Sequence, residues 1–153
     1  MNLAAIYSAM GDDDGAVVEY QQAAELMELT PELLLNLANS LGKTGRFAEM
    51  QATLEQLLRM KPSAIAHERL GSALFRTGRF ADALDQFRKA LELDPRHYPA
   101  LNGVAVCRLN DYLSSSKRDD AARQEAVAAL RRSLGLERDQ PRVVELLTRY
   151  GGS

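Results

Sequence analysis

The chain has 153 residues, of which 46% are hydrophobic and 26% are charged, and its net charge is −2. This composition is typical of a folded globular protein, and the balanced charge argues against nucleic acid as a partner. No apolar run approaches the roughly 20 residues that a membrane-spanning helix needs. The N-terminus lacks the basic and apolar segments of a signal peptide, so we expect a cytoplasmic protein with no membrane partner. The single Cys107 excludes an intrachain disulfide framework.

The sequence Thr-Gly-Arg-Phe-Ala occurs twice, at Thr44–Ala48 and again 33 residues later at Thr77–Ala81. The flanking residues keep this offset, and a fainter copy of the pattern precedes the first by 34 residues. The aligned residues are Leu37 with Leu70, Leu41 with Leu74, Leu54 with Phe87 and Pro62 with Pro95, and upstream Leu3, Gly11 and Tyr20 with Leu37, Gly45 and Leu54. A period in this range indicates a solenoid of stacked units, none of which buries its own apolar face alone.

Apolar residues within the units recur every three and four positions, as on one face of a helix. Period-two alternation, which would indicate strands, does not occur. The clearest unit predicts a first helix from about Ser63 to Arg76 and a second from about Phe80 to Leu93. Gly78 provides the positive φ that ends the first helix, and Asp94-Pro95 stops the second. The sequence therefore predicts an all-α protein made of helical hairpins.

This unit resembles the tetratricopeptide repeat, in which each hairpin consists of a helix A and a helix B that cross closely at small residues. The resemblance rests on Leu70, Gly71, Leu74, Gly78, Ala83, Phe87, Ala90 and Pro95. It implies a right-handed α–α superhelix of about four hairpins with a capping helix at the C-terminus. We expect units at about 1–29, 30–62, 63–95 and 96–138, all within a single domain over 1–153.

The fourth unit departs from the family's spacing. The helix B alanine expected near residue 117 best matches Ala126, nine residues later, which is about two and a half helical turns. Both helices of this unit are therefore expected to protrude. We expect helix A over about Pro99–Ser114, a break at Ser115–Arg118, an N-cap at Asp119 or Asp120, helix B to about Leu136, and the capping helix over 141–150.

Two groups of residues suggest metal binding or catalysis, but neither has the required pattern. Aligning Gly15 of the Asp12–Gly15 run with the glycine of an EF-hand loop leaves the first and last ligand positions without carboxylates. We interpret these acids as a helix N-cap and first turn. His67, His97 and Cys107 have none of the spacings of zinc sites. We predict no metal, no cofactor and no enzymatic activity, because no catalytic constellation is present.

The resemblance also implies a binding surface, since helix A of this family lines the concave groove in which peptide ligands lie. Asn36 and Asn39 match the two groove positions whose amides often hold a peptide backbone. The equivalent positions carry Arg69 and Ser72 in the third unit and Gly103 and Val106 in the fourth. The candidate groove residues are Asn36, Asn39, Lys43, Arg69, Ser72, Arg76, Asn102 and Asn110. The alternative is that these residues are simply solvated positions on helix surfaces.

The basic residues in the middle of this groove predict an acidic ligand, or one that ends in a carboxylate near Arg69. Chaperone-binding members of the family hold such a carboxylate with a five-residue clamp, of which Asn36 and Arg69 alone are matched here. A chaperone tail is therefore not the expected ligand. The arginines between Arg118 and Arg142 are interleaved with acids, which indicates a solvated helix face rather than a nucleic-acid surface.

The predicted function is protein–protein interaction without catalysis, as an adaptor or scaffold that binds an extended segment of a partner in the groove. The distribution of charge supports an alternative. Residues 1–30 carry a net charge of −6, and residues 96–153 carry +3. Open repeat ends of opposite charge would allow copies to stack head to tail into a homo-oligomer.

Overall fold

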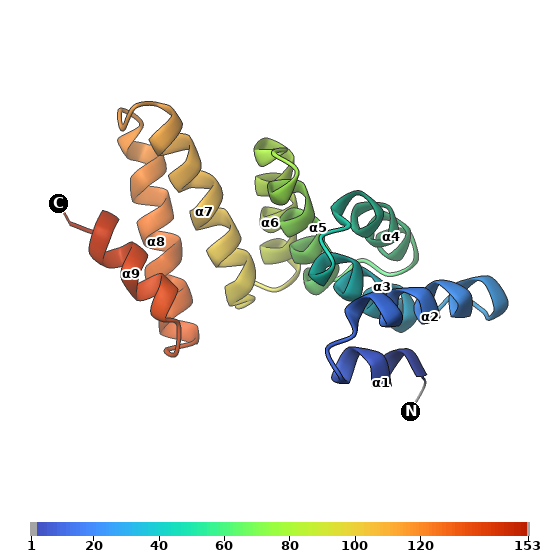
Figure 1. Ribbon diagram of the computed structural model, residues 1–153. Helices are drawn as coiled ribbons and strands as arrows, with labels where there is room; N and C mark the ends of the chain where they lie inside the picture. The colour runs from blue at the N-terminus through green and yellow to red at the C-terminus, as the bar shows by residue number, and fades with distance from the viewer. Residues whose placement is uncertain (1–2, 153) are drawn as a thin grey trace.

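The computed structural model describes residues 3–152, and over that range the chain is helical apart from its turns (Figure 1). The helices are α1 (Leu3–Ala9), α2 (Asp13–Leu26), α3 (Pro31–Lys43), α4 (Phe47–Met60), α5 (Ala64–Arg76), α6 (Phe80–Leu93), α7 (Tyr98–Ser114), α8 (Asp120–Leu136) and α9 (Pro141–Tyr150). No strand occurs among these described residues. The all-α prediction is confirmed.

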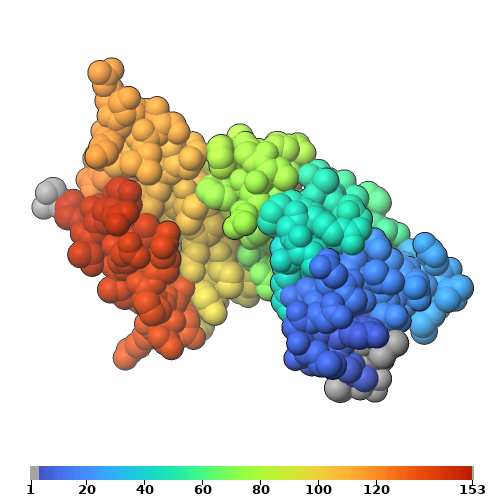
Figure 2. All heavy atoms as spheres, in the orientation of Figure 1, coloured from blue at the N-terminus to red at the C-terminus, as the bar shows by residue number. Residues whose placement is uncertain are grey.

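Consecutive helices pack against one another along the whole array, from α1 to α9. Contacts also join α3 to α5 and α5 to α7, which are the first helices of successive hairpins. Figures 1 and 2 show an elongated particle in which the colour changes steadily from one end to the other. Each hairpin therefore contacts mainly its neighbours, and the fold is the helical repeat solenoid that the sequence period predicts.

The repeated Thr-Gly-Arg-Phe-Ala sequence builds the same turn between helices in both copies. Gly45 and Gly78 have φ angles of 75° and 81°, in the left-handed region that favours glycine. The hydroxyl of Thr77 donates to two carbonyl oxygens of the preceding helical turn, at 3.1 and 3.0 Å, and the hydroxyl of Thr44 does the same. The same carbonyl oxygens also accept the backbone N–H groups of Thr44, Arg46, Thr77 and Arg79, so each threonine hydroxyl adds a second hydrogen bond to carbonyls of the last helical turn.

The fourth hairpin is longer than the others, because α7 and α8 contain 17 residues each. Helix α7 begins at Tyr98, one residue earlier than predicted, since a proline such as Pro99 fits the first turn. Ser116 and Lys117 follow α7 with positive φ angles of 56° and 64°. Asp119 then caps α8, and its Oδ1 accepts from the backbone N–H of Ala122 at 3.0 Å. The joined tips of α7 and α8 extend beyond the neighbouring hairpin (Figure 1).

Helix α9 lies along α8 and is held at both of its ends. Gln140, just before α9, donates through Nε2 to the hydroxyl of the fully buried Ser133 at 3.0 Å. At the other end, Arg123 donates through Nη1 to the carbonyl oxygen of Tyr150 at 2.8 Å. The positive charge of Arg123 at this C-terminal end of α9 also interacts favourably with the helix dipole. Val143, which is 5% exposed, packs between these two anchors.

Tight packing in the middle of the array surrounds the ring of Phe87 on α6, which is 3% exposed. A Cβ atom at Gly71 of α5 would lie 2.8 Å from this ring, and a Cβ atom at Gly103 of α7 would also overlap it. The ring therefore fills a space that exists because both neighbouring helices carry glycine there. Ala83 and Ala90, on the same helix as Phe87, are 0% exposed, as close helix crossing requires.

We predict that Gly103→Ala lowers the free energy of unfolding by about 1–3 kcal/mol, the usual cost of overpacking. Gly135→Ala is the matched control, because Gly135 also lies in a helix but no packed neighbour lies within 4 Å of an added Cβ. The better helix propensity of alanine should raise stability there by up to about 1 kcal/mol. Urea unfolding measures both changes. Equal changes in the two variants would contradict the packing described around Phe87.

Candidate functional site

A groove of about 520 Å³ opens along α3 and α5, and its size lies within the range of ligand-binding clefts. Its walls also include Ser8 of α1, Tyr20 of α2, and Phe47 and Met50 of α4. Six of the eight predicted site residues line this groove: Asn36, Asn39, Lys43, Arg69, Ser72 and Arg76. They lie together because they occupy equivalent positions on the first helices of two successive hairpins, which pack side by side.

The amides of Asn36 and Asn39 are free hydrogen-bonding groups in the wall of the groove. Both residues are half-buried, and their side chains have no hydrogen-bond partner among the described residues. Each amide offers two donors and one acceptor, which suits an extended backbone. Tyr20, which is 4% exposed, lies beside them, and burial raises the pKa of its phenol. The Tyr20 hydroxyl is therefore neutral at physiological pH.

Two of the three groove cations are paired with acids of the protein itself. Lys43 Nζ lies 3.2 Å from Asp13 Oδ1. Arg69 Nη1 lies 3.1 Å from Glu68 Oε2, and Glu68 is 6% exposed. The hydroxyl of Ser72 donates to the other carboxylate oxygen of Glu68 at 3.0 Å. A ligand carboxylate near Arg69 would therefore compete with Glu68.

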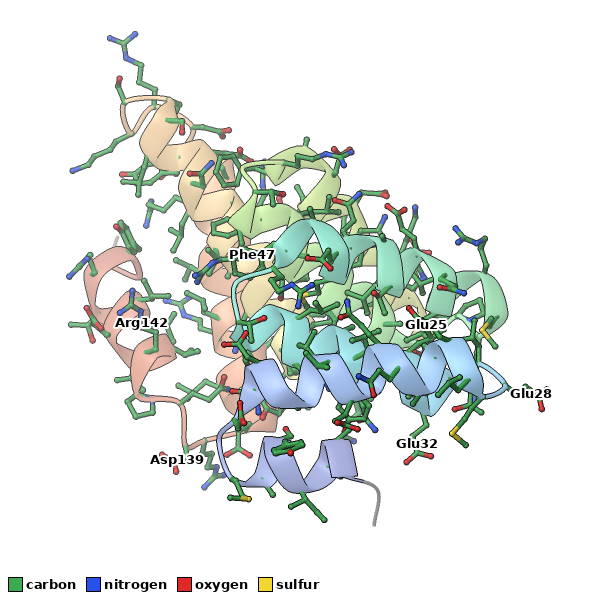
Figure 3. All side chains as sticks on the ribbon, turned by 45° about the vertical axis from the view of Figure 1, so that its right-hand side comes forward. Glu25, Glu28, Glu32, Phe47, Asp139 and Arg142 are labelled. Atoms are coloured by element: carbon green, nitrogen blue, oxygen red, sulfur yellow. The ribbon has the colours of Figure 1, made fainter. Side chains whose placement is uncertain are left out.

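Arg76 is the groove cation that has no carboxylate partner among the described residues. Its guanidinium lies over the ring of Phe47, with Cζ 5.1 Å from the ring centroid. Such stacking holds a cation in place while leaving its N–H groups free to donate. Phe47 begins α4 and lies in the middle of the array (Figure 3). The most available positive charge of the groove therefore stands beside an aromatic ring.

A second, mainly apolar pocket of about 410 Å³ adjoins the groove and shares Gly42, Phe47, Ser72 and Arg76 with it. Its further walls are Phe75, Phe87, Pro99, Asn102, Gly103 and Val106. Two equivalent positions of successive hairpins differ in the walls of this pocket. Phe75 packs edge-on against Phe80 with ring centroids 5.0 Å apart, whereas the residue equivalent to Phe75 in the preceding hairpin is Gly42. An added Cβ at Gly42 would lie 2.9 Å from Met50 Sδ, so a thioether rather than an aromatic ring packs at that position.

The last two predicted residues, Asn102 and Asn110, do not line the groove. Asn102 lies in the wall of the apolar pocket, and its Nδ2 donates to Gln140 Oε1 at 2.7 Å. This bond ties α7 to the segment before α9, so the Asn102 amide has a structural partner. Asn110 lies further along α7 and lines neither the groove nor the apolar pocket. Sequence register placed both residues on helix A, but their side-chain neighbours depend on the irregular fourth hairpin.

The other candidate residues have structural surroundings. Asp12 caps α2, and its Oδ1 accepts from the backbone N–H of Gly15 at 2.9 Å, as interpreted from the sequence. His67 Nδ1 hydrogen-bonds with Gln86 Oε1 at 2.8 Å. Burial raises the pKa of the Cys107 thiol to about 12, which leaves it protonated and unreactive. No three His, Cys, Asp or Glu side chains of residues 3–152 gather as a metal site.

A separate question is whether any element could lie within a bilayer. Over the described part of the chain, no helix combines the length and apolar character that crossing a membrane would require.

Sequence reasoning missed the aromatic residues of the groove and the acids that pair with its cations. Phe47 belongs to the repeated motif, and a residue of such a motif is most simply interpreted as a packing residue. The alignment of the two units does indicate a difference at Phe47, because the position that holds Phe75 in the third unit holds Gly42 in the second. The partnership of Arg69 with Glu68 has no comparable signal, since adjacent residues on a helix point in different directions.

Comparison with known families agrees with this architecture. The family model described as "Tetratricopeptide repeat" matches residues 35–107. The chain belongs to the tetratricopeptide-repeat family. Small glutamine-rich tetratricopeptide repeat-containing protein 2 from Mycosarcoma maydis is 32% identical over 111 residues, which make up 71% of this chain and 31% of that relative. The chain thus spans about a third of the relative's length. Tetratricopeptide-repeat proteins are typically non-catalytic modules for protein–protein interaction.

Solved structures share the fold at low sequence identity. The crystal structure of MamA has a TM-score of 0.80 at 21% identity, covering 98% of this chain and 83% of that one. YrrB, described as "a TPR protein with an unusual peptide-binding site", has a TM-score of 0.77 at 18% identity, covering 95% and 71%. The first tetratricopeptide-repeat domain of Spaghetti (RPAP3), bound to the HSP90 peptide SRMEEVD, has a TM-score of 0.68 at 20% identity, covering 79% and 90%.

Proposed function

We propose that the protein binds an extended, acidic segment of a partner protein in the groove between α3 and α5. The observation that carries this proposal is Arg76, a groove cation with no carboxylate partner among the described residues. Lys43 and Arg69 add positive charge to the same walls. The free amides of Asn36 and Asn39 suit the backbone of the segment, because they both donate and accept.

The paired acids set the order in which the three cations attract a ligand. Asp13 and Glu68 already neutralise Lys43 and Arg69 in part, whereas Arg76 keeps its full charge. The carboxylate of a bound segment, from a side chain or a C-terminus, therefore binds first at Arg76. The ring of Phe47 removes water from one face of the guanidinium, which strengthens a charge-assisted hydrogen bond formed at its edge.

Two structural neighbours support a peptide ligand, although their identity to this chain is low. YrrB is described as having an unusual peptide-binding site, and the Spaghetti (RPAP3) domain is bound to SRMEEVD, a peptide that contains two adjacent glutamates. An acidic peptide is therefore compatible with this fold. In the present chain the proposal rests on the groove's own residues.

We predict that random peptides displayed on phage and selected on the wild-type protein are enriched in Asp and Glu, and that Arg76→Gln weakens their binding. Loss of one charged hydrogen bond should lower affinity about ten-fold to a hundred-fold. Fluorescence polarisation of the synthesised peptides measures this loss. Affinity should also fall with added salt, because charges are screened over about 8 Å at physiological ionic strength.

Arg142→Gln is the matched control for this experiment. Arg142 is 82% exposed on α9, lines neither the groove nor the apolar pocket, and forms a loose surface ion pair at 3.8 Å. Removing its charge should leave affinity unchanged, because such exposed pairs contribute little. If the selected peptides bind Arg76→Gln with unchanged affinity but bind Arg142→Gln more weakly, the binding surface lies at the end of the array and not in the groove.

Head-to-tail self-association is the second candidate function, and the two ends of the array favour it. Met10, which follows helix α1, is 76% exposed and precedes the acidic run Asp12–Asp14. Three further acids, Glu25, Glu28 and Glu32, lie near the outer end of α2 (Figure 3). At the other end, Val144 is 47% exposed in a shallow pocket with Arg131 and Arg138. Two ends that carry opposite charges around exposed apolar side chains can form a head-to-tail contact between two copies.

This second candidate predicts that the mean mass by light scattering rises with protein concentration and falls when salt is added. Val144→Asp should reduce the association by weakening the apolar contact and the positive charge together. Arg76→Gln, which alters the groove instead, should not change it. A constant monomer mass from micromolar to millimolar concentration would rule out self-association through these ends.

A further inference from the structure

The groove and the apolar pocket form one continuous surface with two chemical characters. Gly42, Phe47, Ser72 and Arg76 belong to the walls of both. On one side of this boundary lie the amides and cations of α3 and α5. On the other side lie the rings of Phe75 and Phe87 and the side chain of Val106, on α5, α6 and α7.

The apolar side cannot hold a peptide in the way the groove does. The positions equivalent to Asn36 and Asn39 carry Gly103 and Val106 on α7, so no pair of amides faces the ligand there. The remaining amide, Asn102, donates through Nδ2 to Gln140 Oε1, which leaves a single amide oxygen, Oδ1, without a hydrogen-bond partner among the described residues. Val106 is 37% exposed at the mouth of the pocket, and the ring of Phe87, which is 3% exposed, lies deeper in the same wall. This part of the surface favours an apolar side chain.

Resting on the proposed function, we infer that the partner segment carries a bulky apolar residue, such as Leu or Phe, close to the acidic residue that binds Arg76. The apolar side chain enters the pocket between α5 and α7 while the carboxylate pairs with Arg76 at its border. Because Arg76 is held against Phe47, the two subsites keep a fixed separation. The ligand is thus an acidic segment with a neighbouring apolar anchor rather than an evenly acidic one.

Synthetic peptides separate the two subsites. Each peptide has a Gly/Ser background with one Glu-Glu pair, and a Leu, Phe or Ser is placed at each position up to about four residues away, since an extended chain advances about 3.3 Å per residue. At the best position, the Leu or Phe peptide should bind wild-type protein about ten-fold more tightly than its Ser counterpart, from the burial of one apolar side chain. Fluorescence polarisation measures the affinities.

Val106→Asn tests whether this gain arises in the pocket, because it places an uncharged polar group at the pocket mouth. It should remove most of the gain from Leu or Phe while leaving the affinity of the Ser peptide unchanged. Val18→Asn is the matched control, since Val18 is a 48% exposed helical valine outside both the groove and the pocket. It should leave all affinities unchanged, and thermal unfolding confirms that both variants are folded.

The possible failures point to different conclusions. Equal affinity of the Ser, Leu and Phe peptides at every position, with binding still dependent on Arg76, would overturn the apolar anchor and leave the proposed function standing. A gain that persists undiminished in Val106→Asn would place the apolar side chain elsewhere and would also overturn the inference. Absence of binding by every Glu-Glu peptide would refute both the anchor and the acidic-peptide function.

Discussion

The packing of Phe87 between Gly71 and Gly103 is the contact on which the rest of this structure depends. The ring occupies the space between two successive hairpins, and neither glycine can gain a Cβ without moving it. This contact brings α5 and α7 close enough to touch, so that their exposed faces form one surface. Phe87 also forms part of the wall of the apolar pocket. A single buried ring therefore links the stability of the repeat array to the shape of the proposed binding surface.

Small changes between repeats give this surface its chemical character. Lys43 and Arg76 occupy equivalent positions, but Lys43 meets Asp13 across the helices whereas Arg76 meets the ring of Phe47. Gly42 and Phe75 are also equivalent, so the ring of Phe47 lacks the aromatic neighbour that Phe75 provides to Phe80, and Met50 packs against Gly42 instead. The repeat fixes where side chains point, and these local substitutions decide which of them remain available to a ligand. The candidate site thus differs from one repeat to the next while the fold stays the same.

The sequence predicted the fold closely because the features that define it are local. The turn glycines, the proline stops and the 33-residue period each act within a few residues, and even the long fourth hairpin followed from the position of Ala126. The lining of the candidate groove was predicted in part. Helix register identified the six residues that line the groove, but the pairing of Arg69 with Glu68 and of Asn102 with Gln140 depends on side-chain directions and on distant packing. Hydrophobic periodicity carries no information about either.

The proposed binding of ligands to the groove formed by α3 and α5 is tested most directly by NMR. The measurement is the ¹⁵N spectrum of the protein during titration with the acidic peptide that binds most tightly among those selected by phage display. We expect changes in the Nε–Hε resonance of Arg76 and in the side-chain amides of Asn36 and Asn39, because these groups face the groove without hydrogen-bond partners among the described residues. Changes confined to α8 and α9, with those three resonances unmoved at saturation, would contradict binding in this groove.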